Sequence, residues 1–212
     1  NVKHEVVPNF GDLKMMLSCI RPDVEIRYTT DGSEPHEYSM LYRRPLIIKQ
    51  SQTVKCATFK DGKRLGQILA IPVHVSGVTG RNVLRSTSVE RRLVNGVRGS
   101  LKNTDDEWTF WKKNDSIAVT IDVGARKRLG KVSLGYLNHF GLGIHKPQRV
   151  EVWLSDNDVH YWKATEQTFG RDEIFAEGRF TEEMELIFKD VARYVRVIMK
   201  GAGKCPEHHV RP

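Results

Sequence analysis

The sequence predicts an all-β protein built of two sandwich domains, and three observations support this prediction. Short segments alternate apolar with polar residues or are rich in β-branched residues, as half-buried strands are. Turn-forming residues separate these segments at short intervals, and helical periodicity is poor throughout. The chain has 212 residues, which is enough for two small domains that each bury a core.

The first 77 residues predict an immunoglobulin-like sandwich. Residues 25–29 alternate as a strand should, and the Asp-Gly-Ser turn at 31–33 follows them directly. Two more strands are expected over residues 45–48 and 53–59. The Asp-Gly pair at 61–62 predicts a hairpin into a last strand over residues 66–75. Roughly seven short strands at this spacing are typical of that architecture.

Residues 76–80, Ser-Gly-Val-Thr-Gly, are the best linker candidate, so we divide the chain into residues 1–77 and 78–212. Strand patterns resume beyond the linker over residues 119–123, 131–137, 149–154 and 194–199. Residues 181–188 fit a helical turn and an edge strand equally well. The loops are long and carry Trp, His, Asn and Asp, which indicates a sandwich or jelly roll with functional loops at one end.

Charge and hydropathy argue against nucleic-acid binding and against a membrane span. The net charge is +8, but the excess is spread over both halves, with 11 Lys/Arg against 8 Asp/Glu in residues 1–77 and 23 against 18 in the rest. The densest basic run, residues 126–128, falls in an expected turn, which favours a solvated loop. We find no zinc-finger spacing, no aromatic RNA-binding signature and no apolar window long enough to cross a bilayer.

Three cysteines, Cys19, Cys56 and Cys205, do not make a disulfide framework because the count is odd. Cys19 and Cys56 could meet across a sandwich. Each lies in an apolar strand pattern, however, which favours small buried thiols.

The run IRYTTDGSEP at residues 26–35 is specific, and it is followed by Tyr42, by Pro45 and by a strand over 53–59. This stretch resembles the small domain that follows the catalytic barrel of bacterial β-N-acetylhexosaminidases (chitobiases), which are family 20 glycoside hydrolases. The resemblance covers about residues 12–75 and implies an immunoglobulin-like domain. Cys56 stands where that family usually has another small residue.

The second half resembles the discoidin-like module, also called factor V/VIII type C, which is close to family 32 carbohydrate-binding modules. The motifs are LVNGVRGS at 93–100, Trp108, Asn-Asp at 114–115, IDVG at 121–124, GIHKP at 143–147, the strand ending in Ser at 152–155, ARYVRV at 192–197 and CPEHH at 205–209. The resemblance implies a galactose-binding-like sandwich or jelly roll over about residues 80–212. It also implies a closing strand with an aromatic and an acidic residue, which this sequence lacks.

Both modules occur in this order in the hexosaminidase family. The resemblance therefore implies a non-catalytic accessory fragment of a β-N-acetylhexosaminidase-like enzyme, working in the periplasm, at the cell surface or outside the cell. A catalytic barrel needs about 250 residues and does not fit this chain. The acidic run 105–107 is interpreted as a solvated loop.

The discoidin-like family also implies a structural calcium. In this sequence the site would use the side-chain oxygen of Asn95, where the family has Asp, with backbone oxygens near Arg98 and Ser100. Calcium prefers several hard oxygen ligands, so the loss of a carboxylate weakens the set.

A sugar presents apolar C–H faces and a rim of hydroxyls, so its binder needs an exposed ring and a few fixed polar groups. The candidates lie in the loops of the second half: Trp108, Trp111, Asn138, His139, Phe140, Glu207 and His209. Trp108 could instead plug its loop, and Phe140 could be a loop anchor.

Three functional hypotheses follow from these observations. The second module could bind glycans such as amino sugars or galactosides. Both modules could instead brace the catalytic barrel of the same polypeptide, which requires an exposed apolar face. Adhesion to another protein or to a lipid surface is the third, and it requires protruding apolar residues with a basic collar.

Overall fold

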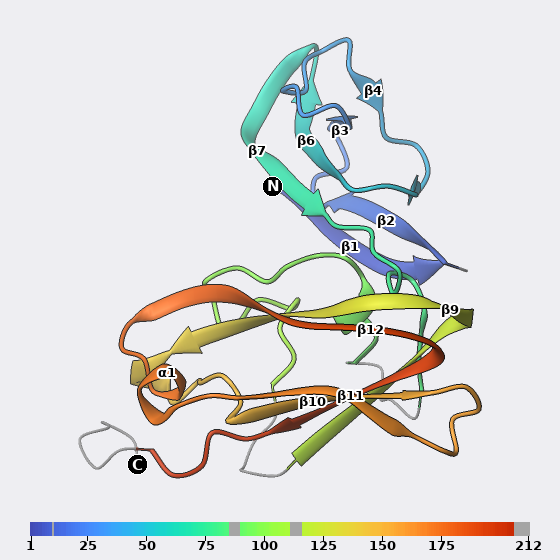
Figure 1. The fold of residues 1–212 in the computed structure, drawn as a ribbon. Coiled ribbons are helices and arrows are strands. Elements are labelled where there is room, and N and C mark those ends of the chain that lie inside the picture. The colour runs from blue at the N-terminus through green and yellow to red at the C-terminus, as the bar shows by residue number, and fades with distance from the viewer. Residues whose placement is uncertain (10, 85–89, 111–115, 206–212) are drawn as a thin grey trace. The chain divides into compact units, whose positions relative to one another are not determined.

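The computed structural model describes residues 1–9, 11–84, 90–110 and 116–205. The chain divides into two compact units, one of residues 1–81 and 91–98 and the other of residues 82–90 and 99–212. Nearly all regular structure is antiparallel β-sheet (Figure 1), which confirms the all-β prediction. Because the positions of the two units relative to each other are not determined, each is considered by itself.

The first unit is a sandwich of two antiparallel sheets, one with the order β1-β2-β5 and one with the order β4-β3-β6-β7. Its strands are β1 (Val2–Asn9), β2 (Asp12–Cys19), β3 (Glu25–Thr29), β4 (Met40–Leu41), β5 (Leu46–Ile48), β6 (Gln52–Lys60) and β7 (Lys63–Val73). The two glycine-containing turns expected at 31–33 and 61–62 connect strands as predicted.

Alternation along the strands builds the core of this sandwich. Leu13, Met15 and Leu17 of β2 point to one side and are buried, while the residues between them are more exposed. They pack in one cluster with Val54 and Cys56 of β6, which belongs to the other sheet. The hydrophobic faces of both sheets therefore meet in a single interior.

The first unit extends beyond residue 77, where the sequence predicted its boundary. Residues 91–98 belong to it and include part of the 3₁₀ turn η1 (Glu90–Val94). The His74 amide donates to the Gly96 carbonyl at 2.8 Å, and the Gly80 amide donates to the Val94 carbonyl at 2.8 Å. Val94 and Asn95 are each 2% exposed, so this segment is part of the folded unit and not a free linker.

All three cysteines are free thiols, Cys56 being buried and Cys19 and Cys205 half-buried. Burial raises the pKa of the Cys56 thiol to about 11. We expect Cys19 and Cys205 to react with iodoacetamide at about pH 8 while Cys56 stays protected, because thiolate and access are both needed. Peptide mass mapping checks this, and labelling of Cys56 as fast as Cys19 in the folded protein would contradict it.

The same shift has a consequence for stability. Between the ordinary thiol pKa of 9.0 and the raised pKa of about 11, the unfolded chain loses the Cys56 proton while the folded chain keeps it. Folding stability of the first unit should therefore fall as pH rises through this window.

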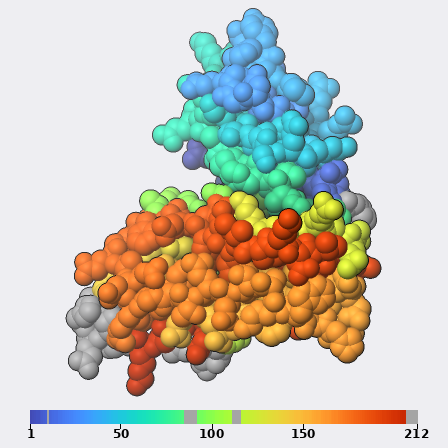
Figure 2. All heavy atoms as spheres, viewed as in Figure 1, coloured from blue at the N-terminus to red at the C-terminus, as the bar shows by residue number. Residues whose placement is uncertain are grey.

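The second unit is organised around one antiparallel sheet with the order β11-β10-β12-β9-β8. Its elements are β8 (Asn82–Leu84), β9 (Ser116–His139), the 3₁₀ turn η2 (Phe140–Leu142), β10 (Arg149–Ser155), β11 (Trp162–Thr168), the short helix α1 (Arg171–Ile174) and β12 (Arg179–Lys200). In Figure 2 the visible face of this unit consists mainly of orange residues from the β10–β12 part of the chain.

Two very long strands, β9 and β12, pair with each other along both of their halves. The first half of β9 pairs with residues 194–200, and its second half pairs with residues 179–187. Register shifts interrupt the ladder near Ile187 and Ala192, and Figure 1 shows β12 bending along its length. Such irregularities let a strand pair curve. Residues 181–188 are therefore strand and not a helical turn.

Alternating side chains along β10 define the core of the second unit. Val150, Val152 and Leu154 of β10 are fully buried on one face. Trp153 points to the other face and is half-buried. Its indole Nε1 donates to the Glu151 carboxylate at 2.8 Å, and the Lys163 ammonium lies 5.4 Å from its ring centroid.

Candidate ligand-binding site

A pocket opens at one end of the second unit, where several strands end or begin. It is built by the residue before β10, the residues after β11, helix α1 and the residues after β12. Its lining residues are Gln148, Phe169, Arg171, Ile174, Phe175, Ala202, Gly203 and Lys204.

Backbone hydrogen bonds fix the floor of the pocket. The Gln148 amide donates to the Lys200 carbonyl at 2.9 Å, and the Phe169 amide donates to the Gln148 carbonyl at 2.9 Å. Gln148 thus joins the ends of β12 and β11. The buried ring of Phe169 lies beneath the Lys146 ammonium, which is 4.3 Å from its centroid.

Helix α1 contributes Arg171 and Ile174 to the pocket, and Phe175 follows the helix directly. The Gly170 amide donates to the Glu173 carboxylate at 2.9 Å, and Lys146 lies 3.6 Å from the other carboxylate oxygen. The backbone donor first, and Lys146 after it, hold the pKa of Glu173 below its usual range. Ile174 is buried, while Arg171 is exposed.

Aromatic rings continue from the pocket into the neighbouring loop. The Arg171 guanidinium lies 5.5 Å from the Phe175 ring centroid. Phe175 in turn contacts His145 edge to face at 5.0 Å, and His145 contacts Phe140 at 5.9 Å. The sulfur of Cys205 lies 3.9 Å from His145 Nε2. The pocket lining therefore combines aromatic side chains with the cations Arg171 and Lys204.

Asn138 supports this pocket and does not face a ligand, contrary to the sequence-based expectation. The side chain is 1% exposed, and its amide nitrogen lies 2.9 Å from the Ala176 carbonyl and 3.3 Å from the Gly178 carbonyl. These two bonds hold the turn that follows Phe175. A buried amide with its donors used in this way is structural.

His139 and Phe140 lie beside the same turn. The Phe140 amide donates to the Gly178 carbonyl at 3.0 Å, and His139 pairs with Arg179 in the β9–β12 ladder. Both side chains are half-buried, and Phe140 is separated from pocket residue Phe175 by the His145 ring. The ring of Phe140 thus acts as an anchor within the aromatic stack, the alternative that the sequence had left open.

The Trp108 side chain packs inside its own loop. Its indole Nε1 donates to the Ser100 carbonyl at 2.7 Å, and a Cβ on Gly99 would lie 2.3 Å from the indole ring. The ring therefore rests on a glycine that has no side chain. Arg179 Nε ties this loop to the start of β12 through the Leu101 carbonyl, at 2.9 Å. The other predicted contacts, Trp111, Glu207 and His209, lie outside the described residues.

Two of the oxygens proposed as calcium ligands accept hydrogen bonds from groups of the chain itself. The Asn95 side-chain oxygen accepts a hydrogen bond from the Val97 amide at 3.0 Å. The Ser100 carbonyl accepts a hydrogen bond from the Trp108 indole. Arg98 is exposed and brings no carboxylate. The Asp105 carboxylate accepts hydrogen bonds from the backbone amides of Ser100 and Glu107, so the acidic run stabilises a turn. Within the described part of the chain, no three His, Cys, Asp or Glu side chains gather as a metal site would require.

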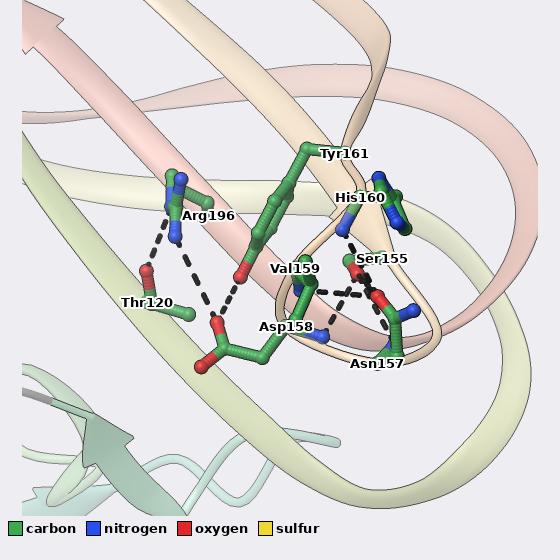
Figure 3. A network of polar contacts seen from close by, with 8 residues as sticks. All are labelled: Thr120, Ser155, Asn157, Asp158, Val159, His160, Tyr161 and Arg196. Carbon is green, nitrogen blue, oxygen red and sulfur yellow. Dashed lines mark hydrogen bonds and ion pairs between the residues drawn. The ribbon is translucent and has the colours of Figure 1, made fainter.

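A second polar cluster, shown in Figure 3, closes the turn between β10 and β11. Ser155 Oγ accepts the Asp158 amide at 2.9 Å, and the Asn157 side chain accepts two further amides of the turn. The Arg196 guanidinium lies 3.8 Å from the Tyr161 ring centroid, and its Nε donates to Thr120 at 3.0 Å. These groups satisfy one another, so the cluster holds the turn.

The pocket residues Phe169, Arg171, Phe175 and Lys204 were not singled out from the sequence. The only local signal is the segment FGRDEIF at 169–175, in which rings and charges alternate in a loop between strands. Lys204 lies far along the chain, and only the fold brings it to the same pocket.

We expect Asn138→Ala to lower the stability of the second unit by about 1–3 kcal/mol, because two carbonyls lose a buried donor. Tryptophan fluorescence during urea unfolding measures this, since all four tryptophans belong to the second unit. Gln167→Ala, which removes an exposed amide on β11, serves as the control. Equal midpoints for the two variants would show that the Asn138 contacts are unimportant.

One comparison with known protein families locates its match in the first unit. Residues 15–72 match the model of the Fn3-associated family. A search of curated proteins found no match. Among solved structures, the chain is similar to the C-terminal domain of a chitobiase from Bacteroides fragilis, with 17% identity over 44% of this chain and a TM-score of 0.29. The aligned region covers 57% of that domain's chain.

Among the described residues, no helix has the length and apolar character needed to cross a membrane. The longest regular elements are the strands β9 and β12.

Proposed function

We propose that this chain is a non-catalytic accessory part of a β-N-acetylhexosaminidase-like glycoside hydrolase and that its second unit binds carbohydrate. The carrying observation is the pocket, which combines the rings of Phe169 and Phe175 with the amide of Gln148 and two cations. Phe169 and Phe175 are 7% and 8% exposed and give the pocket an apolar base. The amide and the cations suit the hydroxyl groups of a sugar. The sequence resemblances described above supply the enzymatic context.

Weak binding fits an accessory role. A pocket with few polar contacts gives low affinity, but a tethered binder raises the local concentration of its enzyme on a glycan. We propose that the catalytic barrel belongs to the same polypeptide and that the protein works in the periplasm, at the cell surface or outside the cell.

Titration with galactose, GalNAc, GlcNAc and chitobiose, followed by NMR shifts and tryptophan fluorescence, tests this proposal. We expect saturable shifts in the amides of residues 169–175 and 202–204. Phe175→Leu keeps an apolar side chain but removes the flat ring, so affinity should fall about three- to tenfold. The control Phe188→Leu changes a residue of β12 outside the pocket, so its sugar affinity should equal that of the unsubstituted chain. Absence of any saturable response in the folded protein, up to high millimolar sugar, would reject carbohydrate binding.

One observation favours a brace as the second candidate function. In the first unit Ile20 and Tyr38 are each 84% exposed and Met40 is 62% exposed. Large apolar side chains at this exposure suit contact with another domain. If sugar titrations fail, binding of this chain to the separately produced catalytic barrel would test the brace.

A further inference from the structure

We infer that the pocket of the second unit selects a sugar that carries a carboxylate, a hexuronate, over the corresponding neutral hexose. This inference rests on the proposed carbohydrate binding and names the class of ligand. Its basis is the charge of the lining: Arg171 and Lys204 both line the pocket, and its lining residues include no acidic side chain.

The two pocket cations differ from several strand cations of this unit that pair with acids. Arg193 pairs with Asp122 at 2.9 Å, and Lys163 pairs with Glu166 at 2.8 Å. Among the described residues, Arg171 and Lys204 make no ion pair with a carboxylate. Two exposed positive charges thus face one hollow without a counter-charge from the lining.

The acids nearest in sequence do not neutralise the pocket. Glu173 directs its carboxylate to the Gly170 amide and to Lys146, and it does not line the pocket. Asp172 is exposed and does not line the pocket. The described lining therefore carries two positive charges and no negative charge.

Arg171 is suited to a planar anion. Its guanidinium lies over the Phe175 ring, 5.5 Å from the centroid, so the aromatic contact orients a fork of donors beside an apolar surface. A carboxylate can accept two parallel hydrogen bonds from such a fork. Phe175 is itself 8% exposed, so its ring serves as an apolar support for the guanidinium.

We expect glucuronate and galacturonate to bind roughly tenfold more tightly than glucose and galactose, the range typical of one charge-assisted hydrogen bond. The preference should shrink when salt is raised from low to about physiological ionic strength, because both cations are exposed. Arg171→Gln should reduce uronate affinity roughly tenfold and hexose affinity by clearly less, so that the ratio of the two affinities falls. Lys204→Gln should give a smaller loss of the same kind.

Calorimetric and NMR titrations of the whole chain with these four sugars decide between the outcomes. Lys189→Gln removes an exposed charge of β12 outside the pocket and is the matched control. Equal affinity for uronates and hexoses would overturn the inference while leaving carbohydrate binding intact. No binding of any sugar would overturn the proposed function itself. Glucose 6-sulfate binding as tightly as glucuronate would show that charge alone is recognised, which rejects the carboxylate assignment.

Discussion

Gly80→Ala should destabilise the first unit by about 3 kcal/mol or more, the combined effect of a left-handed backbone and a close backbone contact. Gly80 has a φ of +71°, and a Cβ there would lie 2.3 Å from the Asp12 carbonyl oxygen. That neighbour is backbone within the Gly11–Asp12 turn, so no side-chain rotation can relieve the clash. The Gly80 amide also donates to Val94, and its displacement would loosen the segment 91–98.

The matched control for this effect is Gly32→Ala. Gly32 has a similar φ of +85°, but an added Cβ there meets nothing within 4 Å. Gly32→Ala should lower the stability of the first unit only through backbone strain, by about 1 kcal/mol. Cys56 lies in the core of the first unit, so its protection against iodoacetamide across a urea series reports the unfolding of this unit. Tryptophan fluorescence should not change, because the first unit contains no tryptophan. Equal losses in the two variants would show that the Asp12 contact relaxes freely.

The fold was predictable from the sequence wherever a strand has one buried face. The alternation in residues 25–29 and the glycine turns at 31–33 and 61–62 are local signals, and the structure follows them. The return of residues 91–98 to the first unit was not predictable. Its basis is the burial of Val94 and Asn95 and two hydrogen bonds to residues 74 and 80, all of which depend on contacts between distant segments.

The pocket lies among the chain connections of the second half and is lined by residues of helix α1 as well as by loop residues. The sequence predicted functional residues in the loops of this half. It could not show which polar loop groups are already satisfied. Trp108 and Asn138 have the right chemistry for a sugar, but both bind backbone carbonyls of their own unit. Arg171 and Lys204 carry no distinctive motif, and their significance comes from sharing one pocket.

Leu154→Ala should destabilise the second unit by about 3 kcal/mol, whereas Trp153→Ala should cost about 1 kcal/mol although it removes a larger side chain. Leu154 is fully buried between the paired strands of the sheet, so its truncation leaves a cavity. Trp153 occupies the outer face, where it contacts Glu151 and Lys163. Glu151 keeps its ion pair with Arg149, at 3.0 Å, when the indole is removed.

Calorimetric melting or far-UV circular dichroism in urea measures both variants without relying on the deleted fluorophore. Protection of Cys56 should be the same in both, because that thiol reports on the other unit. If Trp153→Ala lowers the free energy of unfolding as much as Leu154→Ala does, the outer face of β10 is covered in solution. The outer face of the sheet would then be a contact surface, and the side chains of Trp153 and Lys163 would be the first to test for a partner.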